Sequence, residues 1–284
     1  MFKPKDIVDD VRERFGLQIT YNKAWRAREA AYDTLRGTPE ESYTFLRSFL
    51  HVLVECNFGT TTDLALTQEE RFNYFFFALA ASKEGYKFCR PVICVDRAHL
   101  KGKYKWMMFT AICNDDNNSI FSLACGVGDV ENDSSWLWFF TKFKQVYGDR
   151  SGLVIVSDRH PSIAKAIREI YPGVFHGICM QHLLHNIKNK FRGISVDMLY
   201  YRCAKAYRLC EFTCLMNALT LVQLRLEPYL QEVGYEMWSR AYSEGRRYNI
   251  MTTNISECIN AILVKEHELP VTALAEEMRS LVQR

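Results

Sequence analysis

The sequence predicts an α/β protein built on a mixed β-sheet. Between residues 90 and 192, the apolar segments follow the order β-β-β-α-β-α-β-α, in which short turns join the first three strands and helices separate the later ones. This order combines antiparallel hairpins and helix-linked strands in one sheet. Helical patterns without strands occupy the chain on both sides of this segment. The composition, 48% hydrophobic and 24% charged residues, is that of an ordinary globular protein and excludes a disordered one.

Residues 1–89 predict a helical N-terminal region. Apolar residues recur at helical spacing in Pro4–Phe15 and Tyr21–Leu35, and Thr38 and Pro39 have the composition of a helix start. A further helix is expected from Gln68 to Ser82.

The first two of these helices suggest a helix-turn-helix over residues 7–28. In that interpretation Lys23, Arg26 and Arg28 would face DNA phosphates or base edges. The alternative is that the three cations belong to an ordinary solvated helix face.

The central segment, residues 90–192, supplies the predicted sheet. Its strands are expected at Pro91–Val95, Tyr104–Cys113, Ile120–Val127, Gly152–Ser157 and Gly173–Ile178, and its helices at Asp133–Tyr147, Pro161–Tyr171 and Met180–Phe191. Trp136 and Trp138 in the first helix are expected in the core. Residues 193–250 then predict a purely helical insertion, and residues 251–284 a C-terminal helical region that begins with a helix from Thr253 to Lys265.

Composition and charge exclude several classes of protein. The longest apolar stretch, Phe75–Ala81, is far shorter than the roughly 20 residues that span a bilayer. The charged N-terminus does not resemble a signal peptide. The ten cysteines contain no Cys-x-x-Cys pair and are expected as reduced thiols. The net charge of +3 is too small to predict nucleic-acid binding by itself.

Three acidic residues predict a metal centre. Asp96 and Asp158 each end a predicted buried strand, and Glu257 lies on the last helix. Converging carboxylates disfavour one another unless a cation neutralises them, and Mg²⁺ or Mn²⁺ suits oxygen ligands. Two such ions can support phosphodiester chemistry.

Each acid also has a plainer interpretation. Asp96 would bind turn amides, and Asp158 would cap the following helix. Glu257 stands three residues after Asn254, which is the spacing of a capping box.

Cys179 and His182 are the best candidates for a zinc pair. They belong to a series in which His176, Cys179, His182 and His185 recur every three residues. A structural zinc site needs four converging ligands, which this spacing does not provide. The alternative is a buried cysteine and histidine that pack the start of a helix against the sheet.

Several motifs in the same order resemble plant Mutator-like element (MULE) transposases. They are VDRAHLKGKYK from Val95, ENDSSWLWF from Glu131, VSDR from Val156, CMQH from Cys179 and TTNISECIN from Thr252. The fourth is similar to the Cys-x-x-His signature of the family, and the fifth to the segment around its last acid. The same domain occurs in the far-red-impaired-response family of plant transcription factors. The resemblance is strongest over residues 90–192.

The resemblance implies an RNase H-like fold and a DDE-type site in which Asp96, Asp158 and Glu257 hold two divalent ions, with Glu131 and Glu244 as reserve acids. It implies a nuclear transposase that cuts and joins DNA as a homo-oligomer, acting on terminal inverted repeats and target DNA. Lys101, Lys103, Arg159 and Lys165 would contact phosphates. The alternatives are a domesticated, non-catalytic DNA-binding or transcription-regulatory protein and, more remotely, a nuclease for RNA–DNA hybrids.

Two departures from the family pattern bear on activity. Arg97 follows the first aspartate where the family usually has glycine, and a cation beside the metal site would compete with Mg²⁺ or obstruct DNA. The N-terminal zinc finger and C-terminal SWIM zinc finger of the family are not found in this sequence, which suggests a truncated or degenerate copy.

Overall fold

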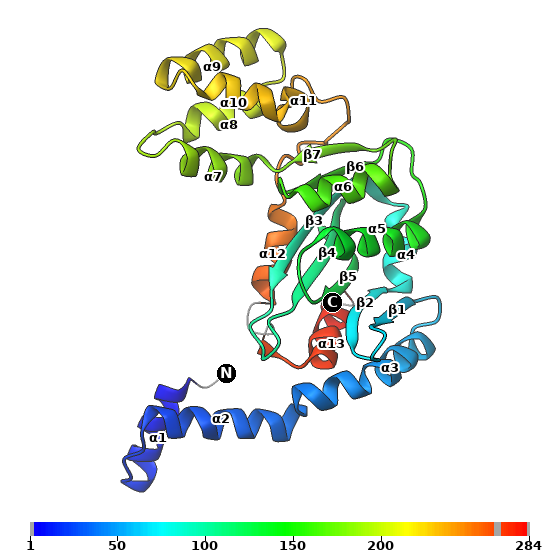
Figure 1. Ribbon diagram of the computed structural model, residues 1–284, viewed down its shortest axis with the longest axis vertical. Helices are drawn as coiled ribbons and strands as arrows, with labels where there is room; N and C mark the ends of the chain where they lie inside the picture. Colours follow the sequence, from blue (N-terminus) through cyan, green and yellow to red (C-terminus); the bar gives the residue numbers. More distant parts are fainter. Residues whose placement is uncertain (1–2, 264–267, 283–284) are drawn as a thin grey trace.

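A seven-stranded mixed sheet forms the centre of the computed structural model, which describes residues 3–263 and 268–282 (Figure 1). The strand order is β1-β2-β5-β4-β3-β6-β7. The strands are β1 (Thr61–Leu66), β2 (Phe72–Ala78), β3 (Cys89–His99), β4 (Met107–Asp115), β5 (Ile120–Gly128), β6 (Val154–Ser157) and β7 (Phe175–Ile178). Neighbouring strands from β1 to β3 pair antiparallel, whereas β3, β6 and β7 pair in parallel.

The helices surround this sheet and extend beyond both of its ends. They are α1 (Pro4–Phe15), α2 (Tyr21–Arg36), α3 (Pro39–Cys56), α4 (Ala80–Tyr86), α5 (Asp133–Tyr147), α6 (Pro161–Ile170), α7 (Met180–Lys190), α8 (Asp197–Lys205), α9 (Leu209–Val222), α10 (Leu226–Val233), α11 (Tyr235–Trp238), α12 (Asn254–Ile262) and α13 (Val271–Val282). The predicted α/β class and the strand and helix order of the central segment are confirmed. Lys265, the predicted end of α12, lies outside the described residues.

The helix expected from Gln68 to Ser82 is wrong, because Phe72–Ala78 forms strand β2. Alternate residues of this strand enter different cores: Phe75 and Phe77 pack with α3, and Phe76 packs with α5. A strand buried on both faces is apolar throughout, so its sequence does not show the alternation of a half-buried strand. The region 1–89 is therefore not purely helical, since β1 and β2 extend the sheet.

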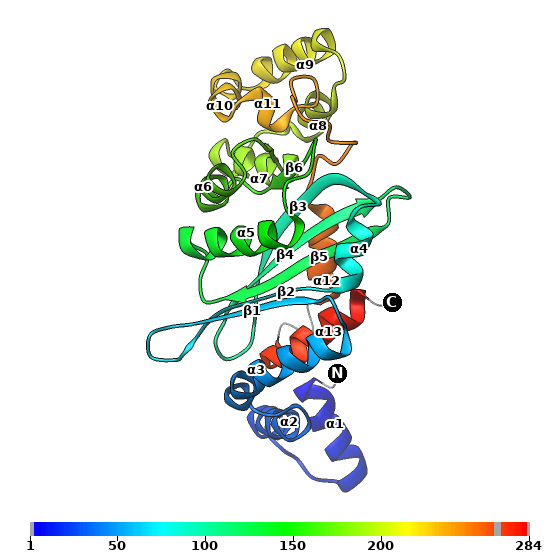
Figure 2. The same cartoon turned by 90° about the vertical axis from the view of Figure 1, so that its right-hand side faces the viewer.

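Helices cover the two faces of the sheet (Figure 2). On one face, α5 and α6 pack on the cluster that contains Ile93 and Val95 of β3. On the other, α3, α12 and α13 pack over the central strands, and Val92 and Cys94 of β3 form a small cluster with β6. Odd and even residues of β3 thus face opposite layers, as strand geometry requires.

Helices α7–α11 form a lobe at one end of the molecule (Figure 1). The lobe has its own core, in which Tyr200, Leu219, Leu230 and Trp238 are fully buried. The lobe begins with α7, earlier than the expected start of the helical insertion, because Leu183 and Ile187 of α7 pack into this core. The segment predicted to be helical, residues 193–250, contains α8–α11 and irregular turns.

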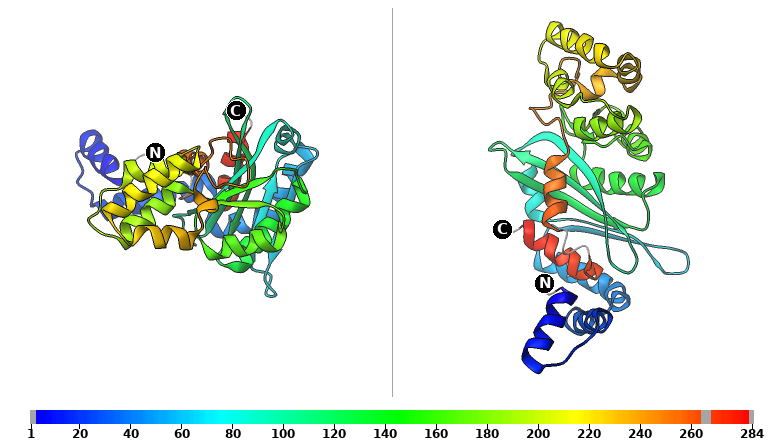
Figure 3. Two further views of the ribbon diagram at one scale, coloured as in Figure 1. Left: turned by 90° about the horizontal axis from the view of Figure 1, so that it is seen from above. Right: turned by 90° about the vertical axis from the view of Figure 1, so that its left-hand side faces the viewer.

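Helices α1 and α2 form a hairpin at the opposite end of the molecule (Figure 3). Gly16, in the left-handed conformation, ends α1, and the Thr20 hydroxyl accepts the N–H of Lys23 at the start of α2. Phe15, Tyr21 and Trp25 remain exposed. We refer to α1 and α2 as the N-terminal arm.

No helix in the described ranges is long and apolar enough to cross a membrane. This finding agrees with the prediction drawn from the short apolar stretches of the sequence.

Candidate metal centre

Strands β3 and β6 place Asp96 and Asp158 side by side. Cys94 of β3 pairs in parallel with Val156 of β6. Asp96 and Asp158 each lie two residues beyond this pair, so their side chains leave neighbouring backbones toward the same face. That face is the one covered by α12, since the Asn260 side chain on α12 donates to Asp96 Oδ2 at 2.9 Å.

Of the three acids Asp96, Asp158 and Glu257, Asp96 is the buried one, with 8% of its surface exposed. Burial raises the pKa of Asp96 to about 6, and the negative charges of Glu257 and Asp158 act in the same direction. The backbone N–H of Arg97 and the charge of His182 oppose this rise. The pKa of Asp96 is thus raised mainly by burial, with a smaller contribution from the neighbouring acids, whose like charges disfavour ionisation.

Asp158 is partly exposed and accepts the backbone N–H of His160 at 3.0 Å through Oδ1. His160 is the residue that precedes α6, and no side chain caps this helix. Asp158 thus binds the amide of the N-cap residue of α6, close to the helix-capping role that was its alternative interpretation.

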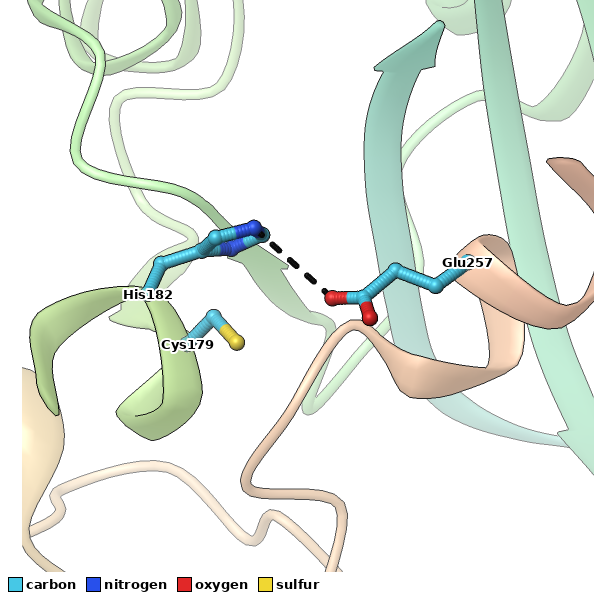
Figure 4. Close-up of side chains that lie close together, drawn as sticks. All are labelled: Cys179, His182 and Glu257. Atoms are coloured by element: carbon cyan, nitrogen blue, oxygen red, sulfur yellow. Dashed lines mark ion pairs between the residues drawn. The ribbon is translucent and has the colours of Figure 1, made fainter. Parts of the chain in front are cut away.

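Glu257 does not form the expected capping box. The N-cap of α12 is Thr253 and not Asn254, and no side chain caps the helix. Glu257 Oε1 accepts a hydrogen bond from the Thr253 hydroxyl at 3.2 Å and lies 3.7 Å from His182 Nε2. The carboxylate thus leaves its own helix and points toward α7 (Figure 4).

Cys179, His182 and Glu257 converge at the start of α7 (Figure 4). One donor atom from each lies within 4.8 Å of the others. Burial alone would raise the pKa of Cys179, but hydrogen bonds from His182 and Thr253 outweigh it and lower that pKa. The hydrogen bond with Cys179 in turn raises the pKa of His182 to about 9. Both shifts have their origin in the same contact between the Cys179 sulfur and the His182 ring.

The other two histidines of the three-residue series do not join this cluster. The His176 ring lies on β7, where its Nε2 is 2.8 Å from the Ser157 hydroxyl. Burial, reinforced by the charge of Arg247, lowers the pKa of His176 to about 4. His185 is exposed on α7.

Arg97 faces away from the metal centre, contrary to the expectation that its charge would compete with Mg²⁺. Because Asp96 points toward α12, its neighbour on β3 points to the opposite layer. There the Arg97 guanidinium forms an ion pair with Glu131, whose side chain is 8% exposed. Glu131 also accepts the indole N–H of Trp136 at 3.1 Å.

The two reserve acids lie elsewhere. Glu131 lies on the α5 side of the sheet through its ion pair with Arg97. Glu244 is exposed in the segment between α11 and α12. Neither replaces Glu257 beside the aspartates.

The predicted phosphate-binding cations fall into three groups. Three are engaged with acidic side chains: Lys165 with Asp133 at 2.5 Å, Lys103 with Glu40, and Arg28 with Glu29 at 2.7 Å. Arg159 donates to the Tyr229 hydroxyl at 3.0 Å and lies over its ring. Lys101, Lys23 and Arg26 are exposed.

Sequence reasoning missed Asn260 and Thr253 as parts of the site. Asn260 stands three residues after Glu257, so both lie on one face of α12 and reach the same region. That spacing was the available signal. Thr253 precedes α12, and its contacts depend on the path by which the chain returns from the lobe to the sheet. The sequence does not reveal this path.

The donor types near Asp96 suit a divalent cation with oxygen ligands, although the group of three donors within 4.8 Å of one another in the described residues is Cys179, His182 and Glu257. Asp96, Asp158 and Glu257 provide carboxylates from three elements, and Asn260 Oδ1 is a buried amide oxygen without a hydrogen-bond partner among the described residues. Carboxylate and amide oxygens are the ligands that Mg²⁺ and Mn²⁺ prefer.

Comparison with known families defines the class of the central domain. Residues 92–186 match the family model of the MULE transposase domain. This segment contains most of β3 and the residues Asp96, Asp158, Cys179 and His182. This segment of the chain is therefore similar to a MULE transposase domain, as the resemblance of its motifs predicted.

Two plant proteins are similar to the chain. Protein FAR-RED IMPAIRED RESPONSE 1 of Arabidopsis thaliana is 23% identical over 126 residues, which cover 44% of this chain and 15% of that protein. Protein FAR1-RELATED SEQUENCE 6 of the same plant is 24% identical over 176 residues, which cover 62% of this chain and 25% of that protein. The matched segment thus spans a quarter or less of these relatives.

Proposed function

We propose that the domain is a DDE-type transposase unit with an RNase H-like fold, which cleaves and joins DNA with two divalent metal ions. The observation that supports this proposal most directly is the parallel pairing of Cys94 with Val156, two residues before Asp96 and Asp158, with the charge of Glu257 on α12 acting on Asp96. The strand order β5-β4-β3-β6-β7, with β4 antiparallel to its neighbours and β6 and β7 parallel to β3, is the order expected for an RNase H-like core.

Each acid has a distinct part in this proposal. Asp96 and Asp158, at the ends of β3 and β6, would hold the ions, and Glu257 of α12 would supply the third carboxylate. When bound, Mg²⁺ or Mn²⁺ activates an attacking oxygen and stabilises the leaving oxygen of the phosphodiester. Asn260 orients Asp96 through its amide and keeps one carboxylate oxygen fixed.

DNA is the proposed partner and the nucleus the proposed location. The MULE transposase match and the resemblance to plant transcription factors support both. Lys101, Lys23 and Arg26 are exposed and available for phosphates, whereas Lys103 and Lys165 must first leave Glu40 and Asp133. The terminal inverted repeats of a transposon and target DNA are the substrates that the family resemblance favours.

The second candidate function is a non-catalytic, transposase-derived domain that binds DNA in transcription. One observation favours it: the Asn260 amide N–H occupies Asp96 Oδ2, an oxygen that a metal ion would use. Glu257 is also held by Thr253 and His182 on its far side. A domesticated domain that had lost cleavage would retain DNA binding while these contacts persisted.

Nicking of supercoiled DNA in Mn²⁺ separates the two functions. We expect the native chain to nick the plasmid and Asp158→Asn to be inactive, while Asp116→Asn, at an exposed turn, serves as the matched control and retains activity. Equal nicking by native and Asp158→Asn protein would contradict the DDE assignment. DNA binding without nicking by any of the three would favour the non-catalytic function, and cleavage of only the RNA strand of a hybrid would indicate a nuclease.

The homo-oligomer implied by the family resemblance remains a prediction. Transposases that act on two DNA ends need two active sites, so we expect at least a dimer when DNA is bound. Light scattering of the free chain and of its complex with DNA measures this directly.

A further inference from the structure

We propose that Cys179, His182 and Glu257 form a binding site for a borderline transition metal, Zn²⁺ by its chemistry, with the fourth position open to water. This site is distinct in ligand type from the carboxylate site of Asp96 and Asp158, although it shares Glu257. Metal binding itself does not depend on the proposed nuclease function.

The donor atoms are close to the geometry that zinc requires. Zinc binds sulfur at about 2.3 Å and nitrogen or oxygen at about 2.0–2.2 Å, so tetrahedral donors lie about 3.3–3.7 Å apart. Sγ of Cys179, a ring nitrogen of His182 and a carboxylate oxygen of Glu257 lie within 4.8 Å of one another. His182 Nε2 and Glu257 Oε1 are already 3.7 Å apart. Small side-chain rotations therefore complete the site.

Thr253 contacts all three proposed ligands. Its backbone N–H donates to Cys179 Sγ at 3.3 Å, and its hydroxyl lies 3.5 Å from His182 Nδ1 and 3.2 Å from Glu257 Oε1. Such outer contacts orient ligands and select which imidazole nitrogen binds the metal. With Nδ1 facing Thr253, Nε2 is the nitrogen left for the metal. Thr253 is itself fully buried, which fixes these contacts.

The set of donors selects the metal. A thiolate, an imidazole and one carboxylate favour zinc over magnesium, which prefers oxygen ligands alone. Cys179 is fully buried, whereas the side chains of His182 and Glu257 are 34% and 36% exposed. The site is therefore open on one side, as in zinc centres with three protein ligands and a water.

A consequence for cleavage rests on the proposed function. Zinc at this site would fix Glu257 against α7, where its carboxylate already lies, and would keep it from turning toward Asp96 and Asp158. Micromolar zinc would then inhibit Mn²⁺-dependent nicking, and Cys179→Ser would relieve that inhibition.

Cobalt substitution tests metal binding without any catalytic assay. Co²⁺ bound to a thiolate gives an intense near-ultraviolet charge-transfer band, so we expect one such band at one equivalent of Co²⁺ in the full chain. Cys179→Ser should abolish the band, and Cys258→Ser, an exposed cysteine next to Glu257 on α12, should leave it unchanged. Asp158→Asn should also retain it, which keeps failure of the zinc site separate from failure of the nuclease.

Further variants keep the test decisive if Cys179→Ser does not fold. Glu257→Gln should lower the affinity for zinc, measured by competition with a chromogenic chelator, and Thr253→Val should lower it by about 10- to 100-fold, the usual effect of an outer contact. The proposal is overturned if the native chain gives no thiolate band. It is equally overturned if the band survives in Cys179→Ser and disappears on replacing Cys210 and Cys214, the exposed pair on α9.

Discussion

Asp96 and Arg97 are adjacent in the sequence, but their side chains belong to different layers of the protein. Asp96 meets Asn260 of α12, and Arg97 meets Glu131 on the α5 side. Because successive side chains of a strand point to opposite faces, Arg97 belongs to a structural ion pair, although its place in the sequence suggests the metal centre. Its charge stabilises a buried carboxylate on the other side of the sheet.

Replacing Arg97 should affect stability and leave cleavage intact. Arg97→Met leaves Glu131 buried without its cation, which should cost about 3–5 kcal/mol of unfolding free energy. Adding Glu131→Gln, which still accepts from Trp136, should recover most of the loss. Urea unfolding measures both. If instead Arg97→Met or Arg97→Gly leaves stability unchanged and alters Mn²⁺-dependent nicking, the placement of this side chain is wrong.

Asp96 should make the metal-free protein less stable as the pH rises. Its pKa of about 6 in the folded chain lies above the ordinary aspartate value of 3.8. Between these values the unfolded chain loses the proton first, so stability falls from about pH 4 to pH 6 and the loss then stays constant, at about 3 kcal/mol. Asp96→Asn should be more stable than the native chain at pH 7.5 in a chelator and closer to it at pH 4. Equal pH profiles of urea unfolding for both would contradict the buried, unpaired carboxylate.

At the scale of elements, a buried arginine connects the lobe to the sheet. Arg247 is 4% exposed, and its guanidinium donates to the carbonyl of Met237 at 3.0 Å and of Ile178 at 3.4 Å. Burial lowers the pKa of Arg247 to about 10. The guanidinium lies against the backbone of β7 at Gly177, where a Cβ would be 1.7 Å from Nη2. Glycine is therefore required at this position by close approach and not by its backbone angles.

Gly177→Ala should destabilise the protein by about 1–3 kcal/mol, the usual cost of overpacking a close contact. Gly173→Ala is the matched control, because nothing lies within 4 Å of its added Cβ. We expect the control to differ from the native chain by at most about 0.5 kcal/mol. Chemical denaturation compares the two, and an equal effect of both substitutions would show that Arg247 does not occupy this space.

At the scale of the whole molecule, three parts follow one another along its long axis: the lobe, the sheet with its helices, and the N-terminal arm (Figure 1). The lobe and the sheet layers each have a buried core, whereas α1 and α2 pack mainly on each other and leave Phe15 and Trp25 exposed. The arm contributes little to the core that holds the metal centre.

Hydrogen exchange should reveal this difference. Amides of α1 and α2 should exchange well before those of β3, β4 and β5, because the arm opens without disrupting the sheet. Mass spectrometry of peptic peptides measures the rates. Equal protection of the arm and the sheet in the free monomer would show that the arm is an integral part of the fold.

Much of the central domain could be predicted from the sequence, because its helices and strands have clear periods and its motifs stand in a fixed order. The helix Asp133–Tyr147 is found with its predicted bounds. The prediction of a helix over Gln68–Ser82 was wrong because a strand buried on both faces is apolar at every position. Its sequence therefore lacks the alternation that identifies a strand. The grouping of Cys179 and His182 with Glu257 could not be predicted, since the lobe folds between them and only its packing brings the chain back.

The return of the chain from the lobe has a practical meaning for engineering. The Met180 N–H donates to the Met251 carbonyl at 2.9 Å, so the segment between them leaves and re-enters the domain at one point. A foreign folded domain whose own termini lie close together could be inserted in the chain at this point. The insertion should be tolerated because closing a longer loop costs only about 0.6 kcal/mol for each doubling of length. The point where Met180 meets Met251 is thus a suitable position for a fluorescent reporter, whose signal would change with the distance between α7 and α12.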